Sequence, residues 1–223
     1  LYNHLPEGER PLLYVTQLYG QIGMIKKNGQ YVQYADNLLN YIPGALPGTG
    51  ESGVVGIYAD PTTGDLFISL VYHNGTKLNG RVVRFITNND GNTYVNNVTI
   101  LDKIPVDYSH QVHTITRGPD GKLYLNTGDA NSLMASQAES KNVNSMAGKV
   151  LRLNEDGSMP ADNPYPGTYT YAGGFRNPFG ATWDPIRNKL FVTNNGADSD
   201  DGIYSITPGS IYGWCCNTSA GTW

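Results

Sequence analysis

His110 is the residue whose type and position best suit acid–base chemistry. It stands just ahead of a strand-like segment that leads into the turn Gly118-Pro119-Asp120-Gly121. A free imidazole has a pKa of about 6.5, close to working pH, which suits a general base. His110 is therefore the candidate general base, and the structural alternative is a histidine that caps a turn.

His113 forms an H-x-x-H pair with His110, a spacing that suggests a metal site. Residues three apart in a strand point to opposite faces of the sheet, so one ion is not expected to bind both. The other two histidines, His4 near the first residue and His73 in a turn, are expected to be solvated.

Arg176 lies in the segment Gly174-Phe175-Arg176-Asn177-Pro178, which begins the fourth of four similar units as His110 begins the third. Equivalent starts in neighbouring units bring both side chains to one end of the fold. A guanidinium there can hold an anionic cofactor and stabilise developing negative charge. An ordinary surface ion pair is the alternative.

The acidic cluster Asp198-Ser199-Asp200-Asp201 directly follows Asn195-Gly196 and Ala197. Carboxylates and exposed backbone carbonyls are hard oxygen ligands, which makes calcium the expected metal. The D-x-D start resembles an EF-hand loop, but the twelfth position holds no glutamate and no helical pattern flanks the cluster, so an EF-hand is rejected. A solvated acidic loop is the alternative.

The segment Gly48-Thr49-Gly50-Glu51-Ser52-Gly53 satisfies the dinucleotide-binding pattern G-x-G-x-x-G. That fingerprint must follow a strand and open a helix. Here it follows a loop rich in proline and glycine and leads into the strand-like run Val54 to Tyr58. The nicotinamide interpretation is therefore rejected.

Short strand-like segments recur along the chain at intervals of roughly 50 to 70 residues and must position these side chains. They are Leu13 to Gln17, Leu66 to Leu70, Leu123 to Thr127 and Leu190 to Asn194. Hairpin-type turn residues precede the last three. A second pair of strands is expected in Ile22 to Tyr34, Arg81 to Leu101, Lys149 to Gly157 and Ile203 to Ile211.

Four units of about four strands each predict an all-β fold, a β-propeller, with a β-sandwich as the alternative. No segment keeps an apolar period of 3.6 residues for three turns, so helix is expected at most around Ser132 to Lys141. We expect one propeller domain over residues 1–223, incomplete at both ends.

The composition excludes two classes of partner. A formal charge of −4 and scattered basic residues argue against nucleic acid, and no uncharged apolar run has the roughly 20 residues of a membrane span. Sequons at Asn74, Asn97 and Asn217 favour a secreted or periplasmic location. The adjacent Cys215 and Cys216 cannot by themselves form a disulfide framework, and they lack the spacing of a zinc site.

Motifs in matching order run through nearly the whole chain. They are Gly50 to Gly56, His110, Gly118 to Tyr124, Gly128-Asp129, Met146 to Asn154, Asp156-Gly157-Ser158, Asp162-Asn163-Pro164, Arg176-Asn177-Pro178, Asn195 to Asp201 and Tyr212-Gly213-Trp214. With these motifs the chain resembles the soluble quinoprotein glucose and aldose sugar dehydrogenases, the glucose/sorbosone dehydrogenase family.

The resemblance implies a six-bladed propeller that binds pyrroloquinoline quinone (PQQ) with calcium beside it and oxidises the anomeric hydroxyl of aldose sugars to lactones. His110 and Arg176 would be the catalytic residues, with His110 taking the proton. The residues implied at the cofactor are Glu51, Arg176, Asn177 and Asn195, and those implied at the metal are Gly196, Ala197, Asp201 and Tyr212.

The chain departs from the glucose enzyme's pattern at several positions. Ser109 replaces an acidic residue that contacts the sugar, Gly202 replaces a glutamate ligand of a second calcium, and Ala197 replaces a proline. Glu51 stands where the glucose enzyme has a glutamine. The family's later blades supply further basic residues for the PQQ carboxylates, and these lie beyond Trp223.

Two other interpretations remain open from the sequence. Propellers of this family also serve as non-catalytic extracellular binding modules, as in the hedgehog-interacting proteins. Propeller hydrolases and lactonases are a third class, which would place acidic side chains inward from several blades. The presence of both His110 and Arg176 favours the enzyme, with a small sugar as its substrate.

Overall fold

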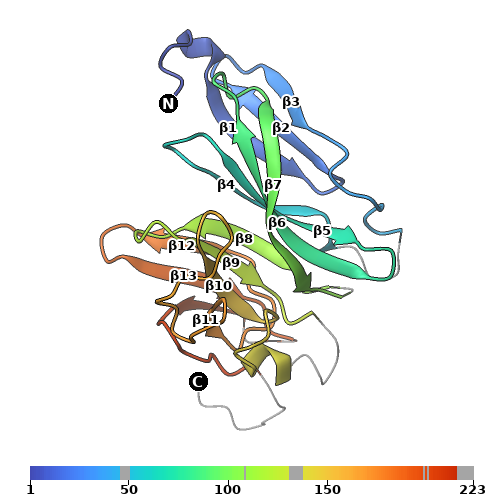
Figure 1. Cartoon of the computed structure of the whole chain (residues 1–223), viewed down its shortest axis with the longest axis vertical. Helices are drawn as coiled ribbons and strands as arrows, with labels where there is room; N and C mark the ends of the chain where they lie inside the picture. Colours follow the sequence, from blue (N-terminus) through green and yellow to red (C-terminus); the bar gives the residue numbers. More distant parts are fainter. Residues whose placement is uncertain (46–50, 108, 131–137, 198, 200, 215–223) are drawn as a thin grey trace.

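The computed structural model describes residues 1–45, 51–107, 109–130, 138–197, 199 and 201–214. These residues form four antiparallel sheets that follow one another along the chain (Figure 1). The first sheet contains β1 (Pro11–Gln17), β2 (Gln21–Lys26) and β3 (Tyr31–Ala35), and the second contains β4 (Val54–Ala59), β5 (Leu66–His73), β6 (Leu78–Thr87) and β7 (Tyr94–Pro105). The third contains β8 (Val112–Arg117), β9 (Leu123–Thr127), β10 (Lys149–Leu153) and β11 (Thr170–Gly173), and the fourth contains β12 (Ala181–Asp184), β13 (Lys189–Asn194) and β14 (Gly202–Ser205).

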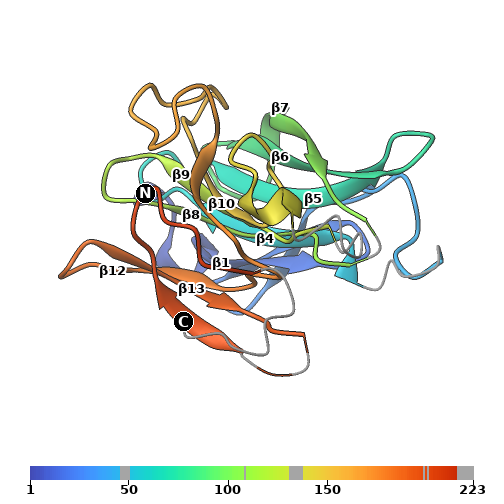
Figure 2. The same ribbon diagram turned by 90° about the horizontal axis from the view of Figure 1, so that it is seen from below.

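Neighbours within each sheet are also neighbours in sequence, so every sheet is a simple meander. Figure 2, the view from below, shows β12 and β13 on one side of the molecule and β6 and β7 on the other. Helix is limited, among the described residues, to the 3-10 turn Glu7–Glu9 and one turn over residues 138–141. The predicted helix around Ser132 to Lys141 is thus present in its last turn, and residues 132–137 lie outside the description.

The recurring leucine-aromatic segments all form strands. They coincide with β1, β5, β9 and β13, and in the last three sheets the preceding turn joins the segment to an inner strand. Leu66, Leu123 and Leu190 are buried there, whereas Leu13 in β1 is 43% exposed. β1 is the edge strand of its sheet, whereas β5, β9 and β13 are each flanked by a strand on both sides.

Three apolar cores hold the four sheets together, one between each adjacent pair. The first and second sheets enclose a cluster around Ile22 and Ile68, the second and third around Val82 and Leu125, and the third and fourth around a cluster containing Phe175. Meandering sheets that bury both faces against their neighbours form a β-propeller, here with four blades. This confirms the predicted fold class, and the β-sandwich alternative is wrong.

The first strands of adjacent sheets pack against each other in sequence, β1 against β4, β4 against β8 and β8 against β12. Gly56 on β4 is required for this packing, because a Cβ atom there would collide with the carbonyl of His113 on β8 and with the hydroxyl of Ser69. The Ser69 hydroxyl donates to the His113 carbonyl at 2.5 Å and accepts from the Gly56 amide at 2.9 Å. The second and third sheets are therefore closely packed where β4 meets β8.

Two of the expected strand pairs are wrong. Lys149 to Gly157 supplies only β10, because the chain then enters a loop whose Asn163 amide donates to the backbone carbonyls of Arg152 and Thr168. Ile203 to Ile211 supplies only β14, because the chain crosses back to the third blade, where Ile211 forms a parallel bridge with Gly173.

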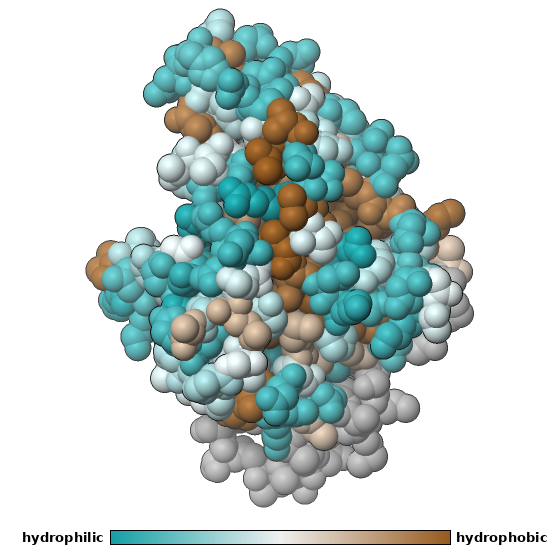
Figure 3. Space-filling view, in the orientation of Figure 1, coloured by the Kyte–Doolittle hydropathy of each residue, from teal (hydrophilic) through white to brown (hydrophobic). Residues whose placement is uncertain are grey.

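Apolar side chains also lie on the surface. Figure 3 shows a stripe of them in the region where β7 is labelled in Figure 1. Val95 and Val98 of β7 are 70% and 45% exposed. No helix within the described ranges is long and apolar enough to cross a membrane.

Candidate functional site

His110 lies at the entrance to β8, where its backbone is held in an unusual conformation. Its φ of +57° is left-handed, which costs a non-glycine residue roughly 1 kcal/mol or more. The Glu51 carboxylate accepts a hydrogen bond from the His110 amide at 2.8 Å, and this contact helps to fix the strained backbone. Gly128 lets the next strand approach, since a Cβ atom there would collide with the His110 carbonyl.

A buried carboxylate orients the His110 ring. Nδ1 lies 2.6 Å from Oδ1 of Asp129, and both side chains are almost fully buried. Because a carboxylate only accepts hydrogen bonds, Nδ1 carries the proton and donates it. In the neutral ring the other nitrogen, Nε2, then carries no proton, and it makes no hydrogen bond within the part of the chain that the structure describes. It is therefore the atom that can accept a proton from a ligand.

Asp129 was not identified as a functional residue from the sequence. Its carboxylate also accepts from the indole Nε1 of Trp214 at 2.7 Å, and its amide donates to the Arg176 carbonyl at 2.8 Å. Asp129 thus connects His110 to both Trp214 and Arg176. The Gly128-Asp129 motif carried the signal, but its partners are distant in sequence.

Arg176 lies at the start of the fourth blade, as predicted, and its side chain reaches the turn after β13. Nη1 donates to the Gly196 carbonyl at 2.7 Å and lies 3.5 Å from the Asn195 carbonyl. The guanidinium also lies over the Trp214 ring, 5.6 Å from its centroid. The remaining guanidinium nitrogens have no hydrogen bond among the described residues, so they can bind an anion.

Asn194 positions the backbone of the Arg176-Asn177 pair. Its side-chain oxygen accepts from the amides of Arg176 and Asn177, both at 3.0 Å. Asn194 is the last residue of the repeated segment Leu190 to Asn194, and Thr127 occupies the same place in the third blade. Thr127 likewise accepts from a neighbouring amide, that of Lys149, so this repeat position could have indicated a positioning role.

His113 and His110 point to different partners. Nε2 of His113 is 2.7 Å from Oδ1 of Asn177, and its ring stacks on Phe179 at 4.1 Å between centroids. Burial lowers the pKa of His113 to about 4, although the hydrogen bond to Asn177 opposes this shift. The neutral ring donates to the Asn177 oxygen and leaves the Asn177 amide nitrogen for another acceptor.

The shifted pKa of His113 predicts a specific loss of stability in acid. The unfolded chain takes up this proton near pH 6.5 and the folded chain only near pH 4, so protonation favours the unfolded state across that interval. We expect the parent protein to lose about 2 kcal/mol or more of unfolding free energy between pH 6.5 and 4.5 that His113→Gln does not lose. Urea denaturation at several pH values measures the difference.

His4→Gln provides the matched control for that experiment, because His4 is an exposed histidine near the first residue. The control should retain the parent's full pH dependence. Equal pH dependence in His113→Gln and the parent would contradict the assignment.

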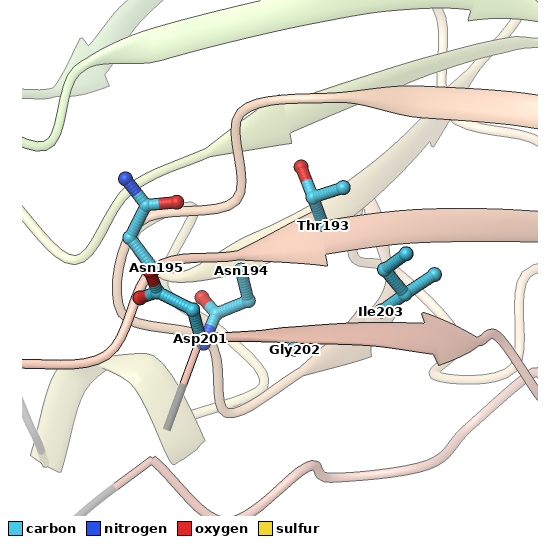
Figure 4. A pocket seen from close by; sticks show the side chains of 6 residues that line it. All are labelled: Thr193, Asn194, Asn195, Asp201, Gly202 and Ile203. Carbon is cyan, nitrogen blue, oxygen red and sulfur yellow. The ribbon is translucent and has the colours of Figure 1, made fainter. Parts of the chain in front are cut away.

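The segment predicted to bind metal borders an open pocket. A hollow of about 260 Å³ lies where β13 ends and β14 begins, and Figure 4 shows Asn194, Asn195 and Asp201 together at this end of the two strands. The Asp201 carboxylate accepts from the Gly196 amide at 2.9 Å, which folds the turn back on itself. Ala197 is exposed beside them.

Tyr212 lies in a different environment from Gly196 and Asp201. Its hydroxyl donates to the Ser205 carbonyl and accepts from the Thr207 amide, both at 2.8 Å, and its ring stacks on Phe175 at 5.0 Å. No three His, Cys, Asp or Glu side chains converge within the described ranges. The predicted metal role of these residues therefore stays a prediction.

Several sequence predictions fall outside the described residues. They concern Gly48 to Gly50, Asp198, Asp200, Cys215, Cys216 and Asn217. The other two sequons, Asn74 and Asn97, are exposed, and the Asn74 side chain caps its own turn by accepting from the amides of Thr76 and Lys77 at 2.9 Å.

Comparison with known proteins agrees with the motifs and the fold. Residues 3–222 match the family described as glucose/sorbosone dehydrogenase. The chain belongs to this family. Among curated relatives, quinoprotein glucose dehydrogenase B of Acinetobacter calcoaceticus is 32% identical over 192 residues, which cover 74% of this chain and 40% of that protein. The HIPL2 protein of Arabidopsis thaliana is 32% identical over 133 residues, covering 50% of this chain and 19% of that protein.

A solved structure supports the same assignment. The PQQ-bound aldose sugar dehydrogenase of Streptomyces coelicolor superposes with a TM-score of 0.75 at 28% identity, covering 90% of this chain and 58% of that chain. This glucose/sorbosone dehydrogenase family member thus spans about 40% of the length of the bacterial relative and somewhat more of the solved structure. The resemblance stated from the sequence is confirmed at the level of the family.

Proposed function

We propose that this chain forms part of a PQQ-dependent dehydrogenase that oxidises the anomeric hydroxyl of aldose sugars, in a secreted or periplasmic location. The observation that carries the proposal is the buried Asp129–His110 pair. It holds one imidazole nitrogen protonated and leaves the other available as a base. The family assignment supports an oxidoreductase that acts on sugars.

The side chains near His110 fit an anionic quinone cofactor. PQQ carries carboxylates and quinone oxygens, which need hydrogen-bond donors and positive charge. Arg176 offers guanidinium donors, and the Asn177 amide nitrogen has no hydrogen bond within the described part of the chain. When bound, PQQ supplies the two-electron acceptor for the sugar's C1 hydrogen. We assign Arg176, Asn177 and Asn195 to its binding, and we place Glu51 beside the cofactor, where its carboxylate holds the His110 amide.

His110 performs the proton transfer in this scheme. The sugar's anomeric hydroxyl loses its proton to Nε2 while the C1 hydrogen leaves with its electron pair, and the C1–O bond becomes the lactone carbonyl. The Asp129 carboxylate stabilises the imidazolium that forms, because it already accepts from Nδ1 at 2.6 Å. Arg176 places positive charge where negative charge develops.

The segment between β13 and β14 supplies only part of the ligands that a calcium ion needs. The carbonyls of Gly196 and Ala197 and the carboxylate of Asp201 are hard oxygen donors, but calcium takes about six to eight of them. The Gly196 carbonyl also accepts from Arg176. We propose that these three residues contribute to a calcium site beside the cofactor, and the proton transfer does not depend on it.

The decisive experiment is a titration with PQQ, with and without calcium, on the protein expressed from its complete reading frame. The quinone absorbance reports binding, and addition of a panel of aldoses reports reduction. Stoichiometric binding followed by bleaching supports the proposal. Binding without any sugar-dependent bleaching would contradict the dehydrogenase activity.

The non-catalytic binding module is the outcome if PQQ does not bind. Similarity to the HIPL2 protein and the two exposed sequons Asn74 and Asn97 favour that second function. Protein or glycan ligands would then be sought with the same protein.

A further inference from the structure

Trp214 occupies a position between the two groups that the proposed function requires. Its indole Nε1 donates to Oδ2 of Asp129 at 2.7 Å, while Oδ1 of the same carboxylate lies 2.6 Å from His110. The same indole ring lies under the Arg176 guanidinium. One side chain thus contacts both the carboxylate behind the base and the cation expected to bind the cofactor.

The backbone of Trp214 is fixed at both of its polar groups. Its amide donates to the Gly174 carbonyl at 2.8 Å, and its carbonyl accepts from the Ser140 hydroxyl at 2.9 Å. The Ser140 carbonyl in turn accepts from the Gly174 amide at 2.7 Å and from the Lys149 ammonium at 2.7 Å. Trp214 is therefore held to the segment that leads into Arg176.

Lys149 strengthens this anchor. It is fully buried, and its ammonium donates to the carbonyls of Glu139, Ser140 and Ala147 at 2.6 to 2.8 Å. A buried ammonium with three acceptors ties the helical turn over residues 138–141 to β10. The indole consequently starts from a rigid backbone, which is what a side chain needs to fix the position of others.

We propose that Trp214 is a positioning residue that holds Asp129, and through it His110, in a fixed geometry relative to Arg176. This inference rests on the proposed function for its catalytic meaning. The hydrogen bond prevents the Asp129 carboxylate from rotating away from His110, and the aromatic ring directs the guanidinium by a cation–π contact.

Trp214→Phe separates the two contacts, because phenylalanine keeps an aromatic ring and loses the indole N–H. We expect kcat to fall by about tenfold or more, while the dissociation constant for PQQ stays within about twofold. Trp214→Leu also removes the ring and should weaken PQQ binding by about twofold to fivefold in addition. Trp183→Phe is the matched control, since the buried Nε1 of Trp183 has no hydrogen-bond partner among the described residues.

A double-mutant cycle distinguishes positioning from general loss of structure. If Trp214 acts through Asp129, then Trp214→Phe should cost little further kcat in the Asp129→Asn background. Full additivity of the two losses, or equal kcat values for Trp214→Phe and Trp183→Phe, would overturn the inference.

A readout without cofactor keeps the test independent of the enzyme activity. In the unmodified apoprotein, the Trp214 indole N–H should give a downfield, exchange-protected NMR signal, assigned with Trp183→Phe and Trp223→Phe. Asp129→Asn should move this signal, and Trp214→Phe should move the His110 ring signals. An indole signal insensitive to Asp129→Asn would refute the contact even if Trp214→Phe did not fold.

If PQQ failed to bind, the proposed function would be wrong. The NMR measurement would still decide whether Trp214 holds the Asp129–His110 pair.

Discussion

His110→Gln should reduce turnover with aldoses by about 10²- to 10⁴-fold, the usual consequence of removing a general base. Glutamine has a similar length but its amide cannot take up the substrate proton. The affinity for PQQ should stay nearly unchanged, because the described contacts of the His110 ring are made with Asp129 and not with the anion-binding residues. Steady-state kinetics and a PQQ titration on the same preparation measure both quantities.

Asp129→Asn tests the same pair from its other side. An asparagine amide can donate to Nδ1, which forces the ring proton onto Nε2 and blocks the base. Turnover should therefore fall although the two side chains still contact each other. His73→Gln is the control, since His73 is the last residue of β5 and its Nδ1 accepts from the Gly75 amide at 3.2 Å, apart from the His110–Asp129 pair. Undiminished turnover in His110→Gln would contradict the role assigned to this ring.

The strands that the sequence predicted well are those encoded by local patterns. The segment Leu66 to Leu70 is a short, largely apolar run preceded by an Asp-Pro turn, so its position needs no information from the rest of the chain. The Asp60 side chain indeed caps that turn by accepting from the amides of Thr62 and Thr63. Every residue from Leu66 to Val71 is buried, as expected for an apolar strand that is covered on both faces.

The strands that the sequence failed to predict depend on contacts with distant residues. Nothing local in Lys149 to Gly157 indicates that the chain will remain a loop until Thr170. The reason lies in Asn163, whose amide bonds the backbone of Arg152 eleven positions earlier in the chain. The return of Ile211 to Gly173 is equally invisible to periodicity, because it is a single bridge between blades.

The residues of the candidate site likewise include some that local sequence predicts and some that it does not. His110 and Arg176 could be selected by residue type and by their place at the start of a unit. Their partners could not, since Trp214 and Asp129 are 85 positions apart and His113 and Asn177 are 64 apart. Such pairs are determined by how the blades pack against each other. No short segment of the sequence contains a pattern that predicts this packing.

Arg152 anchors the third blade through a buried guanidinium that bonds the half-buried Asp120 and the exposed Asp162. The guanidinium on β10 bonds the Asp162 carboxylate through two nitrogens at 2.8 and 3.0 Å, and its Nε donates to Asp120 at 2.9 Å. Hydrogen bonds to Asp162 raise the pKa of Arg152 above its ordinary value. Burial opposes the charge on Asp120, but hydrogen bonds from Lys122, Tyr124 and Arg152 outweigh it and lower the pKa of this carboxyl.

Arg152→Ala should lower the free energy of unfolding by about 3 kcal/mol or more, because it leaves the half-buried Asp120 and the buried Asn163 oxygen without their partner. Arg152→Met retains the packing of the aliphatic stem. The difference in unfolding free energy between the methionine and alanine variants therefore measures packing. The difference between the parent and the methionine variant measures the contribution of the charged hydrogen bonds. Urea denaturation at neutral pH gives the three values.

Arg187, in the turn between β12 and β13 of the next blade, offers a control. Its guanidinium donates to Asp184 at 2.8 Å, as Arg152 does to its aspartates, but its side chain is 70% exposed where that of Arg152 is 6% exposed. An exposed pair of this kind contributes at most about 1 kcal/mol. Arg187→Ala should therefore have a small effect. An equal loss of unfolding free energy in Arg152→Ala and Arg187→Ala would contradict the idea that burial strengthens the Arg152 contacts. The loop over residues 154–169 would then be anchored to the blade by its backbone hydrogen bonds alone.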